Sequence, residues 1–481
     1  WRKMLDILIQ YFPLIFLITS PLLAFAVKLL YLKRKKPFIS FFIFTNCIGF
    51  GLPLIELDRQ YVDGIFGYKY RLEVYMLITP VFLVVLSRRM QWNFMKIPWY
   101  VILGILFFAG INIFNPANPI VSSTILAVAQ IVSYLLFLYM LCSSVNVSTL
   151  LRGVYEGLVY TTILQLILTI CYPILGITEV VELFREGVSI RAAERPGAPG
   201  TFNHPNALGG YMAMTFAFFL VCYLMGYNKR KSLLIGLASF FVLIFTFSRT
   251  ALLATLATTI LIVLIHRTRE SSIFTIKNFF TMILPMLIMA TGLIFLTPIK
   301  DSFIGSNMDE MMLARMMHFY CGYEIVGEYP WLGLGLNTHL EYIRSNISFG
   351  TMFGDINKIF WRAEEFMGSN PIHNVPLILL SELGIVGTLP IVYYIIRQFV
   401  KIKSTLRGEY NESYKIISLF GIALISYILI HGMADWAPVN VLMRNIWMLV
   451  FFAVAIDRYK WEESTPEHSS HTINPRNNIE A

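Results

Sequence analysis

The sequence predicts an all-α fold, a polytopic helical membrane protein with about 12 or 13 transmembrane helices. Hydrophobic residues occupy 57% of the 481 positions and charged residues only 14%, which is more apolar surface than one soluble core can hide from water. Apolar stretches of about 20 residues, the length that crosses a bilayer, recur along the whole chain. Because backbone in lipid must satisfy its own hydrogen bonds, these stretches are expected to be helices.

Thirteen stretches are candidates for membrane-spanning helices. They are residues 5–30, 38–55, 74–87, 97–114, 120–141, 157–176, 205–226, 232–248, 250–265, 279–297, 373–398, 416–431 and 438–456. The number of transmembrane helices is 12 or 13, depending on whether the first stretch, residues 5–30, crosses the membrane. An odd number of helices would place Arg2 and Lys3 outside the cell if the C-terminal tail is inside, against the usual bias of basic residues.

The net charge of +9 is explained by topology, because basic residues gather in short loops. These loops are residues 33–36, 88–96, 229–231, 266–277, 401–415 and 457–460. The positive-inside rule places them in the cytoplasm, so the loops on the other side, which mix acids with bases, are expected outside. Since membrane orientation accounts for the charge, no nucleic-acid partner is expected.

Four regions follow from this pattern. Residues 1–297 would form transmembrane helices 1–10 with short loops, 298–372 a periplasmic cap, 373–456 the C-terminal transmembrane helices, and 457–481 a disordered cytoplasmic tail. Within the cap, helical periodicity from residue 308 to 326 is followed by the Pro/Gly-rich turn "EYPWLGLGLNTH". No repeated block indicates the inverted halves that are typical of secondary transporters.

His373 is the candidate catalytic residue, at the start of the stretch "HNVPLILLSELGIVG". Asn370 followed by Pro371 favours a helix start, which would place His373 in the first turn. The positive end of a helix disfavours a proton on the imidazole, so His373 would be available as a base. Gly384 and Gly387 share its face and would let another backbone approach closely. The alternative is a histidine that only caps the helix.

Glu382 lies in the same stretch, about 13 Å deeper and on the opposite face of the helix. A carboxylate at that depth must be paired or face a polar cavity. We expect a structural role, in which Glu382 bonds to another helix.

Four arginines are candidates for binding a phosphate group on the same side as His373. They are Arg191, Arg195, Arg249 and Arg315. The planar guanidinium suits bidentate contact with phosphate oxygens and does not lose its proton. Each arginine alone could instead be a solvated surface charge or one that reaches to the membrane interface.

Four sequence pieces, in this order, resemble the bacterial O-antigen ligase and O-antigen polymerase superfamily. They are "RPGAPGTFNHPNALGGY" (195–211), "FSRTALLA" (247–254), "LARMMHFYCGYEIVGEYPWLGLGLNTH" (313–339) and "HNVPLILLSELGIVG" (373–387). The last piece fits the ligase pattern through His373, Asn374, Gly384 and Gly387. The resemblance covers about residues 195–390, and the N-terminal third is similar only in being hydrophobic.

The resemblance implies a metal-independent, inverting glycosyltransferase of the bacterial inner membrane with a GT-C-like helical cap and an active site facing the periplasm. The implied donor is a glycan on undecaprenyl diphosphate, and the acceptor is lipid A core or a second lipid-linked glycan. Arg195, Arg249 and Arg315 match the arginines expected to hold the diphosphate, with Arg191 as a second candidate beside Arg195. His373 matches the histidine expected to act on the acceptor. No cofactor and no metal is implied.

Several functions stay open at this point. The pattern at His373 favours an O-antigen ligase that attaches polysaccharide to lipid A core, but a polymerase of O-antigen, capsule or exopolysaccharide uses the same donor chemistry, and a ligase that glycosylates proteins is a further alternative. A transporter or flippase of lipid-linked oligosaccharides would need charges along a path through the bilayer, whereas here they gather on one side. A non-catalytic scaffold would tolerate the loss of His373.

Overall fold

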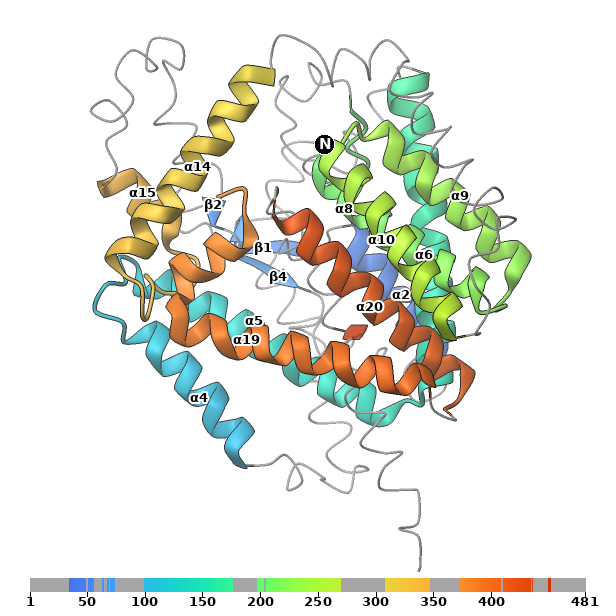
Figure 1. Ribbon diagram of the computed structural model, residues 1–481, viewed down its shortest axis with the longest axis horizontal. Coiled ribbons are helices and arrows are strands. Elements are labelled where there is room, and N and C mark those ends of the chain that lie inside the picture. Colours follow the sequence, from blue (N-terminus) through green and yellow to red (C-terminus); the bar gives the residue numbers. More distant parts are fainter. Residues whose placement is uncertain are drawn as a thin grey trace, which may run out of the picture.

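The computed structural model is a bundle of helices with a few short strands (Figure 1). It describes residues 34–48, 51–55, 63–64, 67–68, 70–73, 99–175, 197–202, 205–269, 308–346, 372–407, 410–433, 435 and 449–450. The helices are α2 (Lys35–Ile48), α4 (Trp99–Ile113), α5 (Val121–Ser144), α6 (Val147–Thr169), α8 (Pro205–Leu224), α9 (Lys229–Phe245), α10 (Arg249–Arg269), α14 (Met308–Glu328), α15 (His339–Asn346), α19 (Val375–Arg407) and α20 (Glu412–Gly432). A π-helical turn, η3 (Ile170–Ile174), continues α6.

Five of the described helices are long and apolar enough to cross a membrane: α6, α8, α10, α19 and α20. The chain is therefore a multi-pass membrane protein. Predicted stretches 97–114, 120–141, 205–226, 250–265, 373–398 and 416–431 all lie on helices. Stretches 5–30, 74–87 and 279–297, and most of 438–456, lie outside the described residues.

The predicted span 38–55 is wrong in its second half. Helix α2 ends at Ile48, after 14 residues, and β1 (Gly51–Ile55) pairs antiparallel with β4 (Tyr70–Glu73). A second small pair joins β2 (Asp63–Gly64) to β3 (Gly67–Tyr68). Gly51 and Pro53 explain the change, because glycine weakens a helix and proline removes a backbone donor from it.

Helix α6 starts ten residues before the predicted stretch 157–176, and its start is fixed by the side chain of Asn146. That side chain accepts a hydrogen bond from the backbone N–H of Thr149 at 2.8 Å. Farther along α6, Gly153 and Gly157 let α2 approach so closely that a Cβ at either glycine would lie 2.6 Å from an isoleucine of α2. Small residues four apart are typical of tight helix pairs in membranes.

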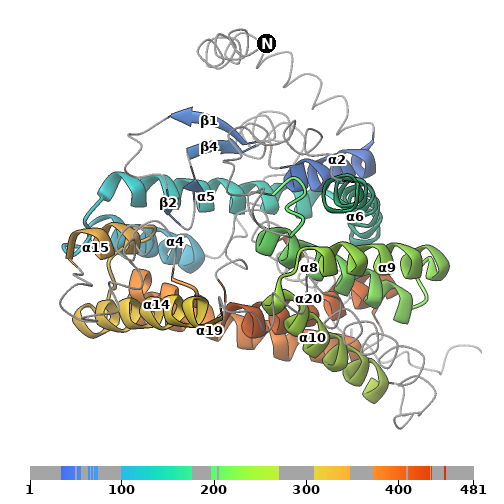
Figure 2. The ribbon, with the colours of Figure 1, turned by 90° about the horizontal axis from the view of Figure 1, so that it is seen from above.

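The helix directions give the bundle two distinct ends. Helices α8, α10 and α19 begin at one end, where α9 and α20 finish, and α6, α9 and α20 begin at the other. Figures 1 and 2 show α20 in the middle, with α8, α9 and α10 on one side and α14, α15 and α4 on the other. The basic residues 229–231 lie at the end away from His373, as predicted, but they form the first turn of α9 and are not a loop.

Candidate active site

His373 lies immediately before α19, which begins at Val375. The side-chain oxygen of Asn374 accepts a hydrogen bond from the backbone N–H of Leu377 at 2.9 Å, so Asn374 is the residue that caps the helix. The prediction that residues 370–371 start the helix and that His373 sits in its first turn is therefore wrong. His373 lies outside the helix, with its backbone available to bond elsewhere.

A second histidine, His318 of α14, contacts His373. The two Nδ1 atoms are 3.1 Å apart and the rings meet edge to face, with centroids 4.6 Å apart. His318 is buried, with 1% of its surface exposed, whereas His373 is only half-buried. The half-buried ring is the one that a substrate can reach, and the buried ring lies behind it.

The contacts between the two histidines favour one tautomer of His373. The backbone N–H of His373 donates to Nδ1 of His318 at 3.2 Å, so that nitrogen acts as an acceptor and carries no proton. We therefore assign the proton between the rings to Nδ1 of His373. In a neutral imidazole with a proton on Nδ1, the lone pair that accepts a further proton is on Nε2.

The last turn of α20 joins His373 to the start of α10. The side-chain amide of Asn374 donates to the carbonyl of Met433 at 2.9 Å, immediately after α20 ends. On the same turn, Nε2 of the buried His431 lies 3.2 Å from the hydroxyl of Thr250. Thr250 follows Arg249 directly, so Arg249 and His373 flank the same helix end.

Arg249 is half-buried at the first residue of α10, after a turn of only three residues. The hydroxyl of Thr246 closes this turn by donating to the carbonyl of Leu243 at 2.6 Å, and Phe247 takes a left-handed backbone with φ 53°. Arg249 therefore lies at a tight turn between two helices. A cation at the positive end of a helix is unfavourable by itself, which makes this a place suited to an anion.

Residues 197–202 and 205–209 pack on that turn. The backbone N–H of Ala198 donates to the carbonyl of Phe245 at 2.8 Å, and a Cβ on Gly197 would lie 2.5 Å from the carbonyl oxygen of Thr246. The side-chain amide of Asn206 donates to the buried Asp435, beyond the end of α20, at 3.1 Å. The glycine-rich segment is therefore held against both the turn at Arg249 and the end of α20.

These contacts bring the four sequence motifs together at one end of the bundle. Motif 195–211 packs on motif 247–254, and motif 313–339 packs on motif 373–387 through the two histidines. Residues 431–435 touch both pairs. The site is thus built from segments up to about 230 residues apart in sequence.

Two of the four predicted arginines, Arg249 and Arg315, lie in the described part of the chain. Arg249 is placed as described above. Arg315 belongs to α14, three residues before His318, which puts the two positions on one face of that helix. Arg191 and Arg195 lie outside the described residues, directly before the segment that packs on the turn at Arg249.

Below His373, α19 is interrupted at Gly384, whose backbone is non-helical with φ 60° and ψ −170°. The loop 330–335 enters this break. Four backbone hydrogen bonds of 2.8–3.0 Å hold it there: Leu334 N to Ser381 O, Gly335 N to Glu382 O, Ile385 N to Pro330 O and Val386 N to Trp331 O. Irregular backbone is tolerated at such a position because it is enclosed by protein.

The prediction of a close backbone approach is right for Gly384 and wrong for Gly387. A Cβ on Gly384 would collide with the carbonyl of Trp331, whereas the atoms nearest to a Cβ on Gly387 belong to Leu383 of its own helix. Because the helix is broken at Gly384, residues before and after the break do not share one straight face. The prediction assumed one continuous helix, so it placed Gly387 on the wrong face.

Glu382 pairs with His339, the first residue of α15. Its Oε1 lies 2.7 Å from Nδ1 of His339, and both side chains are almost fully buried. The expectation that Glu382 bonds to another helix is confirmed. The pair therefore joins the start of α15 to the part of α19 that directly precedes the break at Gly384.

Replacing Glu382 with leucine is expected to lower the free energy of unfolding by about 1–3 kcal/mol, because buried His339 loses its partner. Glu382→Gln keeps an acceptor for the imidazole and should stay close to the native melting temperature. Thermal unfolding of both variants in detergent measures the difference. Equal melting temperatures for the leucine and glutamine variants would show that the pair does not stabilise the fold.

The fold and the site define the class: a multi-pass helical membrane protein with a polar site at one end of its bundle. Residues 233–392 match the family model described as O-antigen ligase, so the resemblance noted in the sequence is confirmed, and this region is a domain of that family. The match covers about a third of the chain and includes three of the four motifs. A comparison with curated proteins finds no match. The family consists of membrane glycosyltransferase-like enzymes that act on lipid-linked glycans.

Sequence reasoning missed His318, His339 and His431. His318 had a signal, since it follows Arg315 by three residues within a quoted motif, and that spacing places both on one helix face. His339 ends the same motif, and Glu382 needed a buried partner. His431 had no signal in the sequence, because no sequence pattern relates the end of α20 to the start of α10.

Proposed function

We propose that the protein is a glycosyltransferase that moves a glycan from undecaprenyl diphosphate to an acceptor hydroxyl on the periplasmic side of the inner membrane. The observation that supports it is the convergence of the four family motifs, with His373 and Arg249 flanking one helix end. The acceptor we favour is lipid A core, which makes the protein an O-antigen ligase of lipopolysaccharide biosynthesis. The match to the O-antigen ligase model supports this choice.

The proposed reaction is a single displacement. The acceptor oxygen attacks the anomeric carbon, a new carbon–oxygen bond forms, and the bond from that carbon to the diphosphate breaks. Undecaprenyl diphosphate leaves with the electron pair, and Nε2 of His373 takes the hydroxyl proton. Attack from the side opposite the leaving group inverts the anomeric configuration.

The arginines are proposed to stabilise the leaving group, because negative charge grows on the departing diphosphate. Arg249 stands at the positive end of α10, where backbone N–H groups also point outward. Donors fixed in advance stabilise such charge without reorganising during the reaction. Arg195, or Arg191 in its place, and Arg315 are proposed to complete the diphosphate site.

A polymerase remains the second candidate, for a structural reason. Two residues of the ligase pattern have roles in the architecture: Asn374 caps α19 and anchors it to α20, and Gly384 admits the loop 330–335. Neither role selects an acceptor. The pattern therefore supports the donor chemistry that ligases and polymerases share.

The acceptor is tested with the purified full chain in lipid nanodiscs, given undecaprenyl-diphosphate glycan and either lipid A core or more of the lipid-linked glycan. A ligase extends lipid A core and leaves the second donor unextended. Elongation of the lipid-linked glycan alone would replace the ligase assignment by a polymerase. No transfer to either acceptor, from a sample whose melting curve shows a folded protein, would contradict the proposed function.

His318 is proposed as a positioning residue, since it holds His373 in the tautomer whose Nε2 is basic. His318→Leu removes the acceptor and is expected to lower kcat about 10- to 100-fold, because a base that is slightly misplaced loses much of its effect. His318→Asn keeps a hydrogen-bond acceptor near the position of Nδ1 and should recover most of the rate. The measurement is steady-state transfer with both variants, with KM and kcat determined separately.

A purely structural role for His318 predicts something else. The leucine variant would then lose thermal stability in proportion to its loss of rate, and the asparagine variant would not rescue kcat. Equal kcat values for the two variants would rule out the positioning role.

A further inference from the structure

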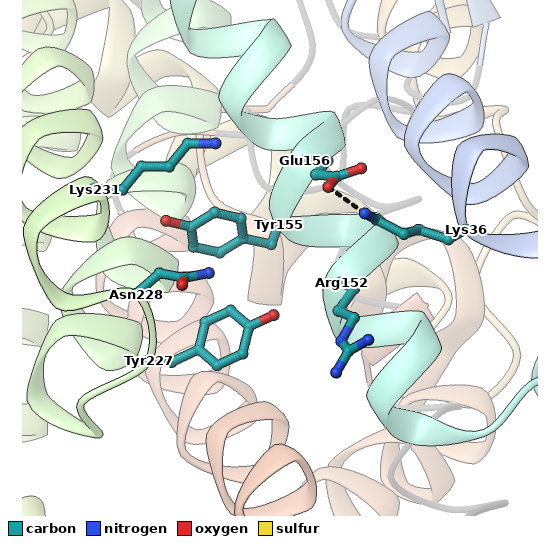
Figure 3. A pocket seen from close by; sticks show the side chains of 7 residues that line it. All are labelled: Lys36, Arg152, Tyr155, Glu156, Tyr227, Asn228 and Lys231. Atoms are coloured by element: carbon teal, nitrogen blue, oxygen red, sulfur yellow. Dashed lines mark ion pairs between the residues drawn. The ribbon is translucent and has the colours of Figure 1, made fainter.

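A second group of cationic side chains lies at the opposite end of the bundle, where α2, α6 and α9 meet. They surround a pocket of about 360 Å³, shown in Figure 3. Its lining residues are Lys36, Arg152, Tyr155, Glu156, Tyr227, Asn228 and Lys231. None of these residues takes part in the proposed glycan transfer.

Three positive side chains come from three different helices. Lys36 belongs to the first turn of α2, Arg152 to the second turn of α6 and Lys231 to the first turn of α9. The lining contains one carboxylate, Glu156, whose Oε1 lies 2.5 Å from Nζ of Lys36. Lys36 and Glu156 neutralise each other, so Arg152 and Lys231 give the pocket an excess positive charge.

Two tyrosines form the rigid part of the pocket between these cations. The rings of Tyr155 and Tyr227 meet edge to face with centroids 5.3 Å apart, and the Tyr155 hydroxyl is 3.2 Å from the hydroxyl of Ser232. Nζ of Lys231 lies 5.6 Å from the centre of the Tyr155 ring. The hydroxyl of Tyr227 is neutral at physiological pH and lies beside Arg152, where it can donate a hydrogen bond. Burial raises its pKa further.

The position along α8 shows how far this pocket is from the candidate active site. Helix α8 begins at Pro205, near the turn at Arg249, and ends at Leu224, three residues before Tyr227. Its 20 residues span about 30 Å, which equals the thickness of the hydrocarbon core of a bilayer. The pocket therefore lies at the headgroup level of the leaflet that the basic loops predict to be cytoplasmic.

The surface of α9 beside the pocket exposes apolar side chains. Leu234 follows Lys231 by three residues on α9, so the two share a helix face, and it is 66% exposed. Leu237 follows Leu234 by three residues, is its neighbour on the helix surface and is 47% exposed. A ligand with a charged group and an acyl chain fits this arrangement, because the chain can lie along α9 while the charge enters the pocket.

We propose that this pocket binds the phosphate group of an anionic phospholipid of that leaflet. The guanidinium of Arg152 matches two phosphate oxygens, the ammonium of Lys231 adds charge, and the hydroxyl of Tyr227 supplies a neutral donor. Such a site would anchor α2, α6 and α9 to a lipid at the far end of the bundle. It is independent of the chemistry at His373.

The test measures lipid binding by native mass spectrometry of the purified full chain, with phosphatidylglycerol, phosphatidylcholine or inorganic phosphate as the probe. The variant Arg152→Gln/Lys231→Gln removes both excess charges. It is expected to bind phosphatidylglycerol about 25-fold more weakly, because each of the two charges that line the pocket and face the phosphate contributes about fivefold. The matched control, Arg230→Gln/Arg397→Gln, removes two exposed charges from outside the pocket and should bind within about twofold of the native protein.

Two further arms make the outcome decisive. The variant Arg152→Lys/Lys231→Arg keeps both charges and should keep binding, which separates loss of charge from loss of folding. Native affinity in the double glutamine variant would overturn the proposal. If phosphatidylcholine binds as well as phosphatidylglycerol, or inorganic phosphate binds more tightly than phosphatidylglycerol, the pocket does not select an anionic lipid and the proposal is also overturned.

Discussion

His373→Ala is expected to slow glycan transfer by about 10² to 10⁴-fold, the usual contribution of a general base. The protein should still insert into the membrane, because the side chain of His373 lies before α19 and Asn374 provides the cap of that helix. Transfer is measured with the purified protein and an undecaprenyl-diphosphate glycan. Since the diphosphate site is left intact, KM for the donor should change much less than kcat.

The matched control for this variant is His266→Ala. His266 is also half-buried, but it lies near the far end of α10, the helix that begins at Arg249. Its loss should leave the transfer rate within about twofold, since that end takes no part in the chemistry. A His373→Ala protein that works as fast as the His266→Ala protein would remove His373 from the mechanism.

Arg249→Ala is expected to lower the transfer rate by about 10² to 10³-fold, which is typical for the loss of one fixed donor to developing negative charge. Unlike the loss of His373, it should also raise KM for the donor, because the diphosphate carries charge before the reaction as well as during it. Arg249→Lys keeps the charge without the planar fork and should recover part of the rate. Steady-state kinetics of the two variants provide the comparison.

The control for Arg249 is Arg230→Ala, which removes an exposed guanidinium at the opposite end of the bundle. Native kinetics are expected for it. If Arg249→Ala and Arg230→Ala both gave native kcat and KM, Arg249 would have no part in holding the diphosphate.

The sequence predicted helices well wherever apolar length alone decides the structure. Stretch 205–226 became α8 and stretch 416–431 became α20, each within a few residues. The stretch 38–55 failed because composition alone does not reveal that the chain leaves the helix near Gly51 and pairs with a strand almost 20 residues later. Pairing partners that are distant in sequence leave no mark on local hydropathy.

The sequence was enough to name candidate residues of the site. It was not enough to predict which distant segments those residues contact. His373 and Arg249 could be named because their motifs carry a histidine and an arginine where apolar residues prevail. That Asn374, and not Asn370, caps the helix depends on its second bond to Met433, which belongs to another helix end. The break at Gly384 likewise depends on a loop some 50 residues earlier, which a helical projection of one segment does not contain.

We propose that the four motifs form one donor site at the end of the bundle where His373 and Arg249 lie. A photoreactive undecaprenyl diphosphate, cross-linked to the full chain in the presence of excess phosphatidylglycerol and mapped by mass spectrometry, tests it directly. We predict labelled peptides from residues 197–209, 246–250, 372–377 and 431–435. Labelling confined to the opposite end, around Arg152 and Lys231, would contradict the claim.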